Sequence, residues 1–177
     1  TKEEDFHYVM DVNVYGPYRI TKAFSPLIIA EKGRVTTISS ISGILSAPGL
    51  GVYSMSKHAI EAFGDALAAE MAPLGVQVSL VEPGNYRSEI SRTAVQRMGL
   101  GATSPLADRS QYPEPDAVAT AVLHSLTDAS PQRRYMVTPN AAEAELTIKK
   151  AIEELVQLNQ DQPYTYDRQK LIEMLDA

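Results

Sequence analysis

GRVTTISSISGILSAPGLGVYSMSKHAIEAFGDAL, residues 33–67, is the stretch that decides the fold of this chain. The run from Arg34 to Ser40 is rich in β-branched residues, which favour strands. A segment with glycine and proline follows, and apolar residues then recur at helical spacing after Val52. The stretch therefore predicts a strand, a loop and a helix that carries Tyr53 and Lys57.

Tyr53 and Lys57 are four residues apart, a spacing that places two side chains on one face of a helix. A cation about 4 Å from a phenol is worth roughly 4 kcal/mol at an effective dielectric constant of about 20. We therefore expect Lys57 to favour the phenolate of Tyr53 and to bring it into the range of general acid/base catalysis. Ser40, thirteen residues before Tyr53, offers a hydroxyl to the same substrate oxygen. The alternative is a tyrosine and a lysine that meet by chance on a solvated helix face.

Two further motifs flank this stretch. Asn13 lies in VNVYG, and a second strand-like run, residues 76–82, leads into PGNYRS, residues 83–88. Together with Ser40 and the Tyr-x-x-x-Lys spacing of YSMSK, they resemble the motifs of the short-chain dehydrogenase/reductase family, in the same order. The resemblance is close over residues 1–92 and looser beyond. EPGNYRSEI is similar to the retinol and hydroxysteroid dehydrogenase branch.

The resemblance implies an activity and a catalytic set. The activity is reversible hydride transfer between a nicotinamide cofactor, NAD or NADP, and a secondary alcohol or its carbonyl. Tyr53 would be the acid/base, and Lys57 would lower its pKa and hold the nicotinamide ribose, so that both residues contact the cofactor. Ser40 would orient the substrate oxygen. Asn13 would hold a water that links Lys57 to solvent.

The resemblance also assigns cofactor contacts to the loop after the second strand. Pro83 and Gly84 would let the backbone pass close to a flat nicotinamide ring, because glycine has no side chain to collide with it. Ser88 takes the place of the family's usual threonine and keeps its hydroxyl. Asn85 is unusual at its position, and a simple turn residue is the alternative interpretation.

Pro17 bears on the interpretation of Asn13. It lies four residues later and lacks the N–H that would bond the carbonyl of residue 13 in a regular helix. We therefore expect the helix to bend there and the freed carbonyl to be able to hold water. The alternatives are an asparagine with a solvated amide and a proline that merely kinks the helix.

Members of the family begin with a Gly-rich turn that holds the dinucleotide pyrophosphate, and these 177 residues contain no such turn. The first residues already resemble the family's central helix. We expect three or four strands to be missing and the sequence to be part of a longer chain, with a natural half-length protein as the alternative. Residues 1–177 are then one domain, the catalytic and C-terminal part of an α/β Rossmann-like doubly wound parallel sheet.

The order of elements along the chain supports that architecture. Strand-like runs alternate with helical patterns, which implies a parallel sheet covered on both faces. Ligands bind such sheets beyond the carboxyl ends of the strands, where Ser40 and Gly84 both fall. The expected strands are residues 34–40, 76–82 and 134–138; the expected helices are residues 6–29 and 52–72, one resuming at 117, one after 140 and one near 167–175; residues 93–115 are expected to be irregular, with room for a short helix.

Composition excludes several classes of function. A net charge of −6 argues against a nucleic-acid partner. No apolar stretch approaches the ~20 residues that a bilayer span requires. The chain has no cysteine, which excludes disulfides and fits a reducing, cytoplasmic location. His7, His58 and His124 are scattered without ligand spacing, so we expect no metal site.

Apolar residues are expected around the open side of the site, which favours a hydrophobic alcohol or ketone as substrate. They lie in the loop before Tyr53 and in the irregular stretch: Leu45, Pro48, Leu50, Val52, Met98, Leu100, Leu106 and Tyr112. Arg92, Arg97 and Arg109 lie in or beside the same stretch. We expect them to face solvent, and the alternative is that they hold an acidic group.

The helices expected at residues 6–29 and 52–72 are unusually apolar for surface helices. The resemblance implies that they pair with their symmetry mates, so we expect a homodimer or homotetramer. Two other functions remain open. One is a nucleotide-sugar epimerase or dehydratase of the family's extended branch, and the other is a non-catalytic binding protein of the same fold.

Overall fold

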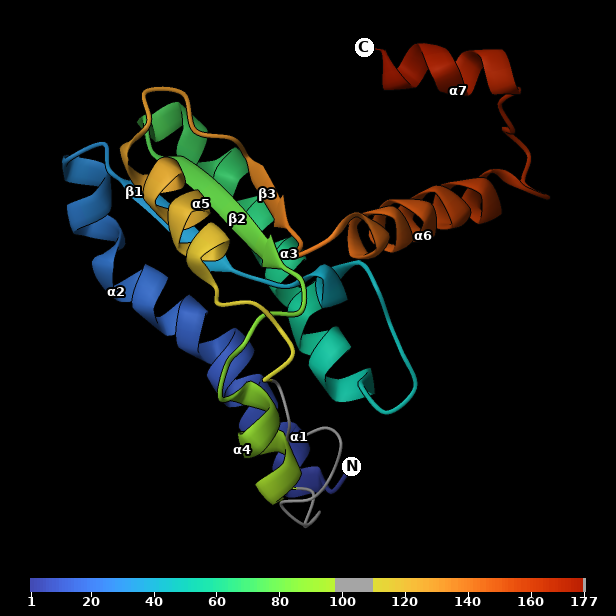
Figure 1. Ribbon diagram of the computed structural model, residues 1–177. Coiled ribbons are helices and arrows are strands. Elements are labelled where there is room, and N and C mark those ends of the chain that lie inside the picture. The colour runs from blue at the N-terminus through green and yellow to red at the C-terminus, as the bar shows by residue number, and fades with distance from the viewer. Residues whose placement is uncertain (98–109, 177) are drawn as a thin grey trace.

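The computed structural model describes residues 1–97 and 110–176. Within them, three strands form a parallel sheet in the order β1-β2-β3 (Figure 1). The strands are β1 Arg34–Ile38, β2 Gln77–Pro83 and β3 Arg134–Val137. In the register, Val35 pairs with Val78 and Val81 pairs with Tyr135. The predicted parallel α/β architecture is confirmed.

Helices cover both faces of this sheet, as a doubly wound fold requires. The α-helices of the described residues are α1 Glu3–Met10, α2 Gly16–Ala30, α3 Gly51–Met71, α4 Ile90–Arg97, α5 Asp116–Thr127, α6 Ala141–Asn159 and α7 Arg168–Leu175. On one face, Leu67 and Met71 of α3 form the core with Val76 and Val78, and Ile28 of α2 packs against them. The helix α5 lies on the opposite face (Figure 1).

Two contacts explain how closely the helices approach the sheet. A Cβ atom built on Gly64 of α3 would lie 2.7 Å from the side chain of Leu80, so only glycine permits this separation. On the other face, the hydroxyls of Thr36 in β1 and Ser125 in α5 are 2.9 Å apart. These two contacts set the distance between the sheet and the helix on each of its faces.

A π-helical turn, Asp11–Tyr15, separates α1 from α2. The N–H of Gly16 donates to the carbonyl of Asp11, five residues back, and Pro17 lies in the first turn of α2. The irregular helix predicted at Asn13 is present in this form. Asn13 is the middle residue of this turn.

The chain enters and leaves α3 through short 3₁₀ turns, Ile41–Gly43 and Ala72–Leu74. After the second turn, Gly75 has φ of +77°, a left-handed conformation that glycine adopts without strain. This cap redirects the chain from α3 into β2.

The helix α4 covers residues 93–97 of the stretch that was expected to be irregular with room for a short helix. It buries Ser91 and Val95. Met98, Leu100, Leu106 and Arg109 lie outside the described residues.

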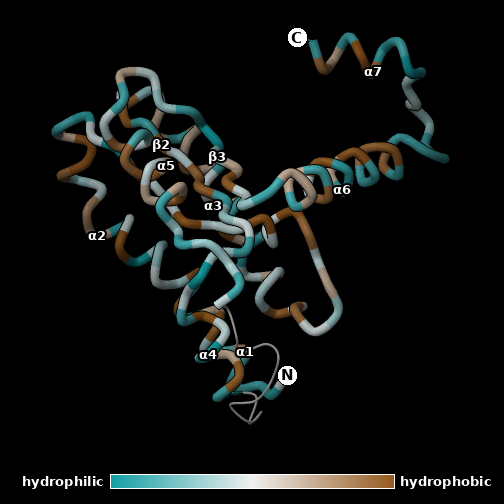
Figure 2. Tube along the Cα trace, viewed as in Figure 1, coloured by the Kyte–Doolittle hydropathy of each residue, from teal (hydrophilic) through white to brown (hydrophobic). Residues whose placement is uncertain are grey.

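The helices α6 and α7 extend away from the sheet (Figure 1). Apolar side chains remain exposed along them, including Ile148, Ile152 and Leu155 (Figure 2). No helix among the described residues is long and apolar enough to span a bilayer.

Candidate active site

Ser40 joins the carboxyl ends of two strands. It follows β1 by two residues, and its Oγ donates to the carbonyl of Pro83, the last residue of β2, over 3.3 Å. The same Oγ accepts the N–H of Ser42 over 3.1 Å and so caps the 3₁₀ turn. The predicted serine and the Pro-Gly turn therefore lie together at one edge of the sheet.

Lys57 lies beside Tyr53, as the helical spacing requires. Its Nζ is 5.7 Å from the centroid of the Tyr53 ring and donates to the carbonyl of Ile38, at the end of β1, over 3.1 Å. Burial lowers the pKa of Lys57 from its ordinary value, and the charge of Glu61 one turn later opposes this effect. The structure thus brings Tyr53 and Lys57 to the strand end that also leads into Ser40.

Asn13 is held against α3 rather than solvated. Its Nδ2 donates to the Oγ of Ser56 over 3.0 Å, and that hydroxyl donates to the carbonyl of Tyr53 over 2.7 Å. Ser56 is completely buried. The alternative of an asparagine with a freely solvated amide is wrong for this reason. The relay water of Asn13 stays a prediction.

Ser56 itself was not predicted as a site residue. The only sequence signal is a small polar residue on the face of α3 that otherwise carries buried apolar side chains such as Ile60. Such a serine usually bonds its own helix, as Ser56 does. Its second bond, to a residue 43 positions away, has no local signature.

Gly84 is required by packing from the chain itself. A Cβ atom there would lie 2.3 Å from Oε2 of Glu143 and 3.0 Å from Cδ of Pro139. The Gly84 N–H donates to the carbonyl of Val137 over 2.8 Å, and the Asn85 N–H donates to Oε2 of Glu143 over 2.8 Å. The predicted reason for this glycine, a nicotinamide ring, is therefore incomplete, because α6 already approaches one side of the residue.

Glu143 was also missed by the sequence analysis, although a signal exists. Asn140 caps α6 by accepting the N–H of Glu143 over 2.9 Å, and Asn140 and Glu143 have the spacing of a capping box. That signal predicts a helix start. It does not reveal that the glutamate reaches back to a loop 58 residues earlier in the sequence.

The other predicted residues are less closely tied to this cluster. Ser88 is exposed and Asn85 is half-buried, so their contacts to a cofactor stay predictions. Leu45, Val52 and Tyr112 are half-buried, whereas Pro48 and Leu50 are exposed.

Two of the arginines expected to face solvent are exposed, as predicted, and they also form ion pairs. Arg97 donates to Asp5 over 3.0 Å and lies 3.8 Å from the centroid of the Tyr8 ring, so it fastens α4 to α1. Arg92 forms an ion pair with Glu89 within the same turn.

A group of charges behind the site, which we call the arginine–carboxylate cluster, consists of Glu61, Asp65, Glu82, Arg133 and Arg134. Arg134 donates to Glu61, to Glu82 over 2.6 Å and to Asp65 over 2.7 Å, and Arg133 donates to Asp65 over 2.9 Å. Burial, followed by the charge of Glu61, raises the pKa of Glu82 to about 7. With Glu82 protonated, two carboxylates face two guanidinium groups.

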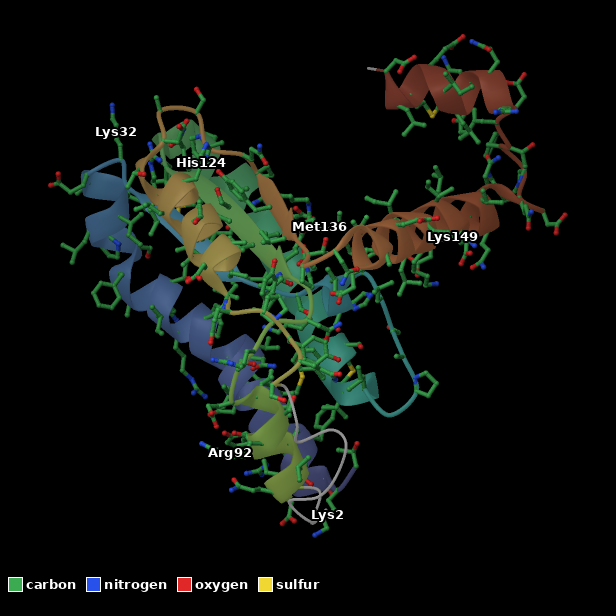
Figure 3. The ribbon with its side chains drawn as sticks, in the orientation of Figure 1. Lys2, Lys32, Arg92, His124, Met136 and Lys149 are labelled. Atoms are coloured by element: carbon green, nitrogen blue, oxygen red, sulfur yellow. The ribbon has the colours of Figure 1, made fainter. Side chains whose placement is uncertain are left out.

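The histidines make structural contacts. The Nδ1 of His58 lies 2.9 Å from the carbonyl of Ser54, and the Nδ1 of His124 lies 2.8 Å from the hydroxyl of Tyr135. Figure 3 shows His124 on α5, at the end of the sheet where β3 begins. Among the described residues, no group of three or more His, Cys, Asp or Glu side chains is arranged to hold a metal ion.

Residues 1–99 match the family model described as short chain dehydrogenase. Mouse mitochondrial D-beta-hydroxybutyrate dehydrogenase is 36% identical over 160 residues, which cover 76% of this chain and 47% of the relative. Mouse retinol dehydrogenase 5 is 35% identical over 157 residues, which cover 75% and 49%. The chain thus spans about half the length of the curated relatives it matches.

Solved structures agree with the fold. A short-chain dehydrogenase from Streptomyces avermitilis superimposes with a TM-score of 0.70 at 26% identity, over 89% of this chain and 60% of that one. One from Burkholderia cenocepacia, solved in complex with NADP, gives 0.68 at 24% identity, over 92% and 61%. With the family model matched over more than half of its residues and the sheet, turn and Tyr-x-x-x-Lys pair in place, this chain belongs to the short-chain dehydrogenase family.

Proposed function

We propose that the protein is an NAD(P)-dependent oxidoreductase that interconverts a secondary alcohol and its carbonyl by hydride transfer. The observation that carries the proposal is the position of the Lys57 ammonium, 5.7 Å from the Tyr53 ring centroid and bonded to the strand end that precedes Ser40. An acid/base, a cation that favours its phenolate and a hydroxyl then meet at the sheet edge where ligands bind.

The residues present fit the nicotinamide end of the cofactor. An ammonium has three N–H donors, and among the described contacts Lys57 uses one, on Ile38, which leaves two for ribose hydroxyls. The turn Pro83–Gly84–Asn85 lies at the same edge and offers backbone to a flat ring on the side away from Glu143. When bound, the cofactor would accept or supply the hydride.

The chain's own residues would manage the proton. In alcohol oxidation Tyr53 Oη takes the substrate's hydroxyl proton, and the neighbouring ammonium of Lys57 stabilises the phenolate that receives it. Ser40 would turn its hydroxyl from the carbonyl of Pro83 to the substrate oxygen. Asn13, fixed by Ser56, would hold the outer end of the proton path.

The names of relatives support an alcohol substrate, because mouse proteins 36% and 35% identical are dehydrogenases of D-beta-hydroxybutyrate and of retinol. The side chains before Tyr53 favour an apolar one. Leu45 and Val52 are half-buried and Leu50 is exposed, so a ligand at this loop would cover apolar surface.

We also propose that the active unit is longer than these residues. Ile38 belongs to β1, an edge strand of the described sheet, and 45% of its surface is exposed. With Val118, Val122 and Leu126 of α5 it lines an apolar hollow. A further strand on β1 would cover this hollow and satisfy the strand edge.

A homodimer or homotetramer remains our proposal for the assembly. On α2, Ile20, Phe24 and Leu27 are more than half exposed, which is unusual for three neighbouring apolar side chains. The apolar character of α3 is explained in part by the chain itself, because Leu67 of this helix lies in the core. Light scattering of the full-length protein would test the assembly, and a monodisperse monomer would refute it.

The decisive experiment is a cofactor-binding and turnover assay of the full-length protein with NAD and NADP. We expect oxidation of hydrophobic secondary alcohols at higher kcat/KM than of polyols. Lys57→Ala should lower both turnover and cofactor affinity, because its ammonium serves the phenol and the ribose. A clear preference for sugars or sugar nucleotides would reject the substrate class, and absence of binding to either cofactor would reject the proposed function.

A further inference from the structure

Glu143 places a carboxylate on the turn Pro83–Gly84–Asn85. Its Oε2 accepts the N–H of Asn85 over 2.8 Å and fills the space that the absent side chain of Gly84 leaves. The residue comes from α6, the element after β3, so it reaches the turn from the opposite side to Ser40, which bonds Pro83.

The carboxylate is hydrogen-bonded at both oxygens. Asn140 accepts the Glu143 N–H over 2.9 Å, and its Nδ2 lies 3.4 Å from Oε1 of Glu143. The turn on which Oε2 rests is itself held, since the Gly84 N–H donates to the carbonyl of Val137. In Figure 3, Met136 of β3 lies beside the start of α6, whereas Lys149 lies farther out along that helix.

The charge of Glu143 is not neutralised by a neighbour. Within residues 1–97 and 110–176 its carboxylate is bonded by the Asn85 N–H and the Asn140 amide, both uncharged, and no ion pair to it occurs there. Its influence reaches the adjacent Tyr86, whose pKa is raised first by burial and then by this charge. Glu61 and Glu82, in contrast, both bond Arg134.

We propose that Glu143 is a positioning residue that makes the site prefer the oxidised cofactor over the reduced one; this inference rests on the proposed function. Oxidised nicotinamide carries a positive charge on its ring, and the reduced ring is neutral. A fixed, unpaired carboxylate against the turn that meets the ring attracts only the charged form, and the attraction is strengthened where water is excluded. The preference raises the fraction of the enzyme that holds the oxidised cofactor, the form that alcohol oxidation consumes.

The test compares dissociation constants of the oxidised and reduced cofactors for the full-length protein. Glu143→Gln keeps the size and a hydrogen-bond acceptor but removes the charge. We expect it to weaken the oxidised cofactor about tenfold, equivalent to ~1.4 kcal/mol, with the reduced cofactor little changed. Glu145→Gln is the control, because Glu145 is exposed two residues along the same helix and loses the same charge. It should leave both constants unchanged.

An unchanged ratio of the two constants in Glu143→Gln would overturn the inference, as would equal weakening of both cofactors, which indicates a purely structural role. If that variant does not fold, Glu143→Asp decides, because it keeps the charge and should keep the wild-type ratio; loss of the ratio there would also contradict the inference. Wild-type protein that binds neither cofactor would refute the proposed function instead. The two failures are therefore distinguishable.

Discussion

The first two turns of α3 and the two turns that follow use their charged groups in opposite ways. In the first, Lys57 is half-buried, makes one described hydrogen bond and lies over the ring of Tyr53. In the second, Glu61 is buried and bonded to Arg134, which also bonds Glu82. One turn of a single helix separates a group with spare donors from a group whose charge is matched. Lys57 thus keeps donors for a ligand, whereas the charge of Glu61 is matched by Arg134.

The difference follows from burial. Lys57 is half-buried beside the end of β1, whereas Glu61 is buried against Arg134 of β3. There a carboxylate has no access to water and needs a partner. The following four predictions test this division, from the largest expected effect to the smallest.

Tyr53→Phe should lower turnover of the full-length protein by about a thousandfold, because general acid/base groups contribute ~10² to 10⁴ in rate. Cofactor affinity and the melting temperature should stay close to wild type, since only one hydroxyl is lost. Turnover by steady-state kinetics and binding by calorimetry measure the two effects. Comparable turnover in the variant would place the chemistry elsewhere.

Arg134→Leu should lower the free energy of unfolding by about 3 kcal/mol, because it leaves Glu61 and Glu82 buried without their cation. Urea denaturation followed by circular dichroism measures this loss. Arg19→Leu is the matched control: it breaks an ion pair with Asp11 that is more than half exposed, and it should cost well under about 1 kcal/mol. Equal losses in the two variants would contradict a structural role for the cluster.

Ser56→Ala should lower turnover about tenfold, with a loss of roughly 1 kcal/mol in stability, because it removes the hydroxyl between Asn13 and Tyr53. If the two side chains act as one unit, combining Ser56→Ala with Asn13→Ala should cost little more than either change alone. Kinetics of the double-mutant cycle measure the coupling. Fully additive losses would show that the bond does not position Asn13 for the reaction.

Glu82→Gln should flatten the dependence of stability on pH. The pKa of Glu82 in the folded protein is about 7, above its ordinary 4.5, so its contribution is present at acid pH and is lost as pH rises through about 7. Wild-type unfolding free energy should therefore fall by on the order of 1 kcal/mol between about pH 5 and pH 8, and the glutamine variant should lack that component. An identical slope in both proteins would assign the titration to another group.

Local pattern was sufficient for the elements and for the sheet edge at which Ser40 and Lys57 lie. β-branched runs, helical spacing and the Pro-Gly turn act over a few residues, so a single sequence carries them. The bonds of Arg134 to Glu61 and of Glu143 to Asn85 join residues 73 and 58 positions apart. The spacing of residues along the sequence does not reveal such pairs. A capping residue or a charged residue looks the same in the sequence whether the folded protein buries it or leaves it in solvent.

The π-helical turn at Asp11–Tyr15 sets the rotation of α1 about the helix axis relative to α2. It accommodates one residue more than an α-helical turn does, and each residue turns an α-helix by about 100°. Deleting a single residue from this turn would restore a regular helix and rotate α1 by that angle relative to α2. Asp5 would then leave Arg97 on α4 while the fold of the sheet stayed intact. The turn thus behaves as a one-residue insertion whose removal uncouples the N-terminal helix from the helix that follows the Pro-Gly loop.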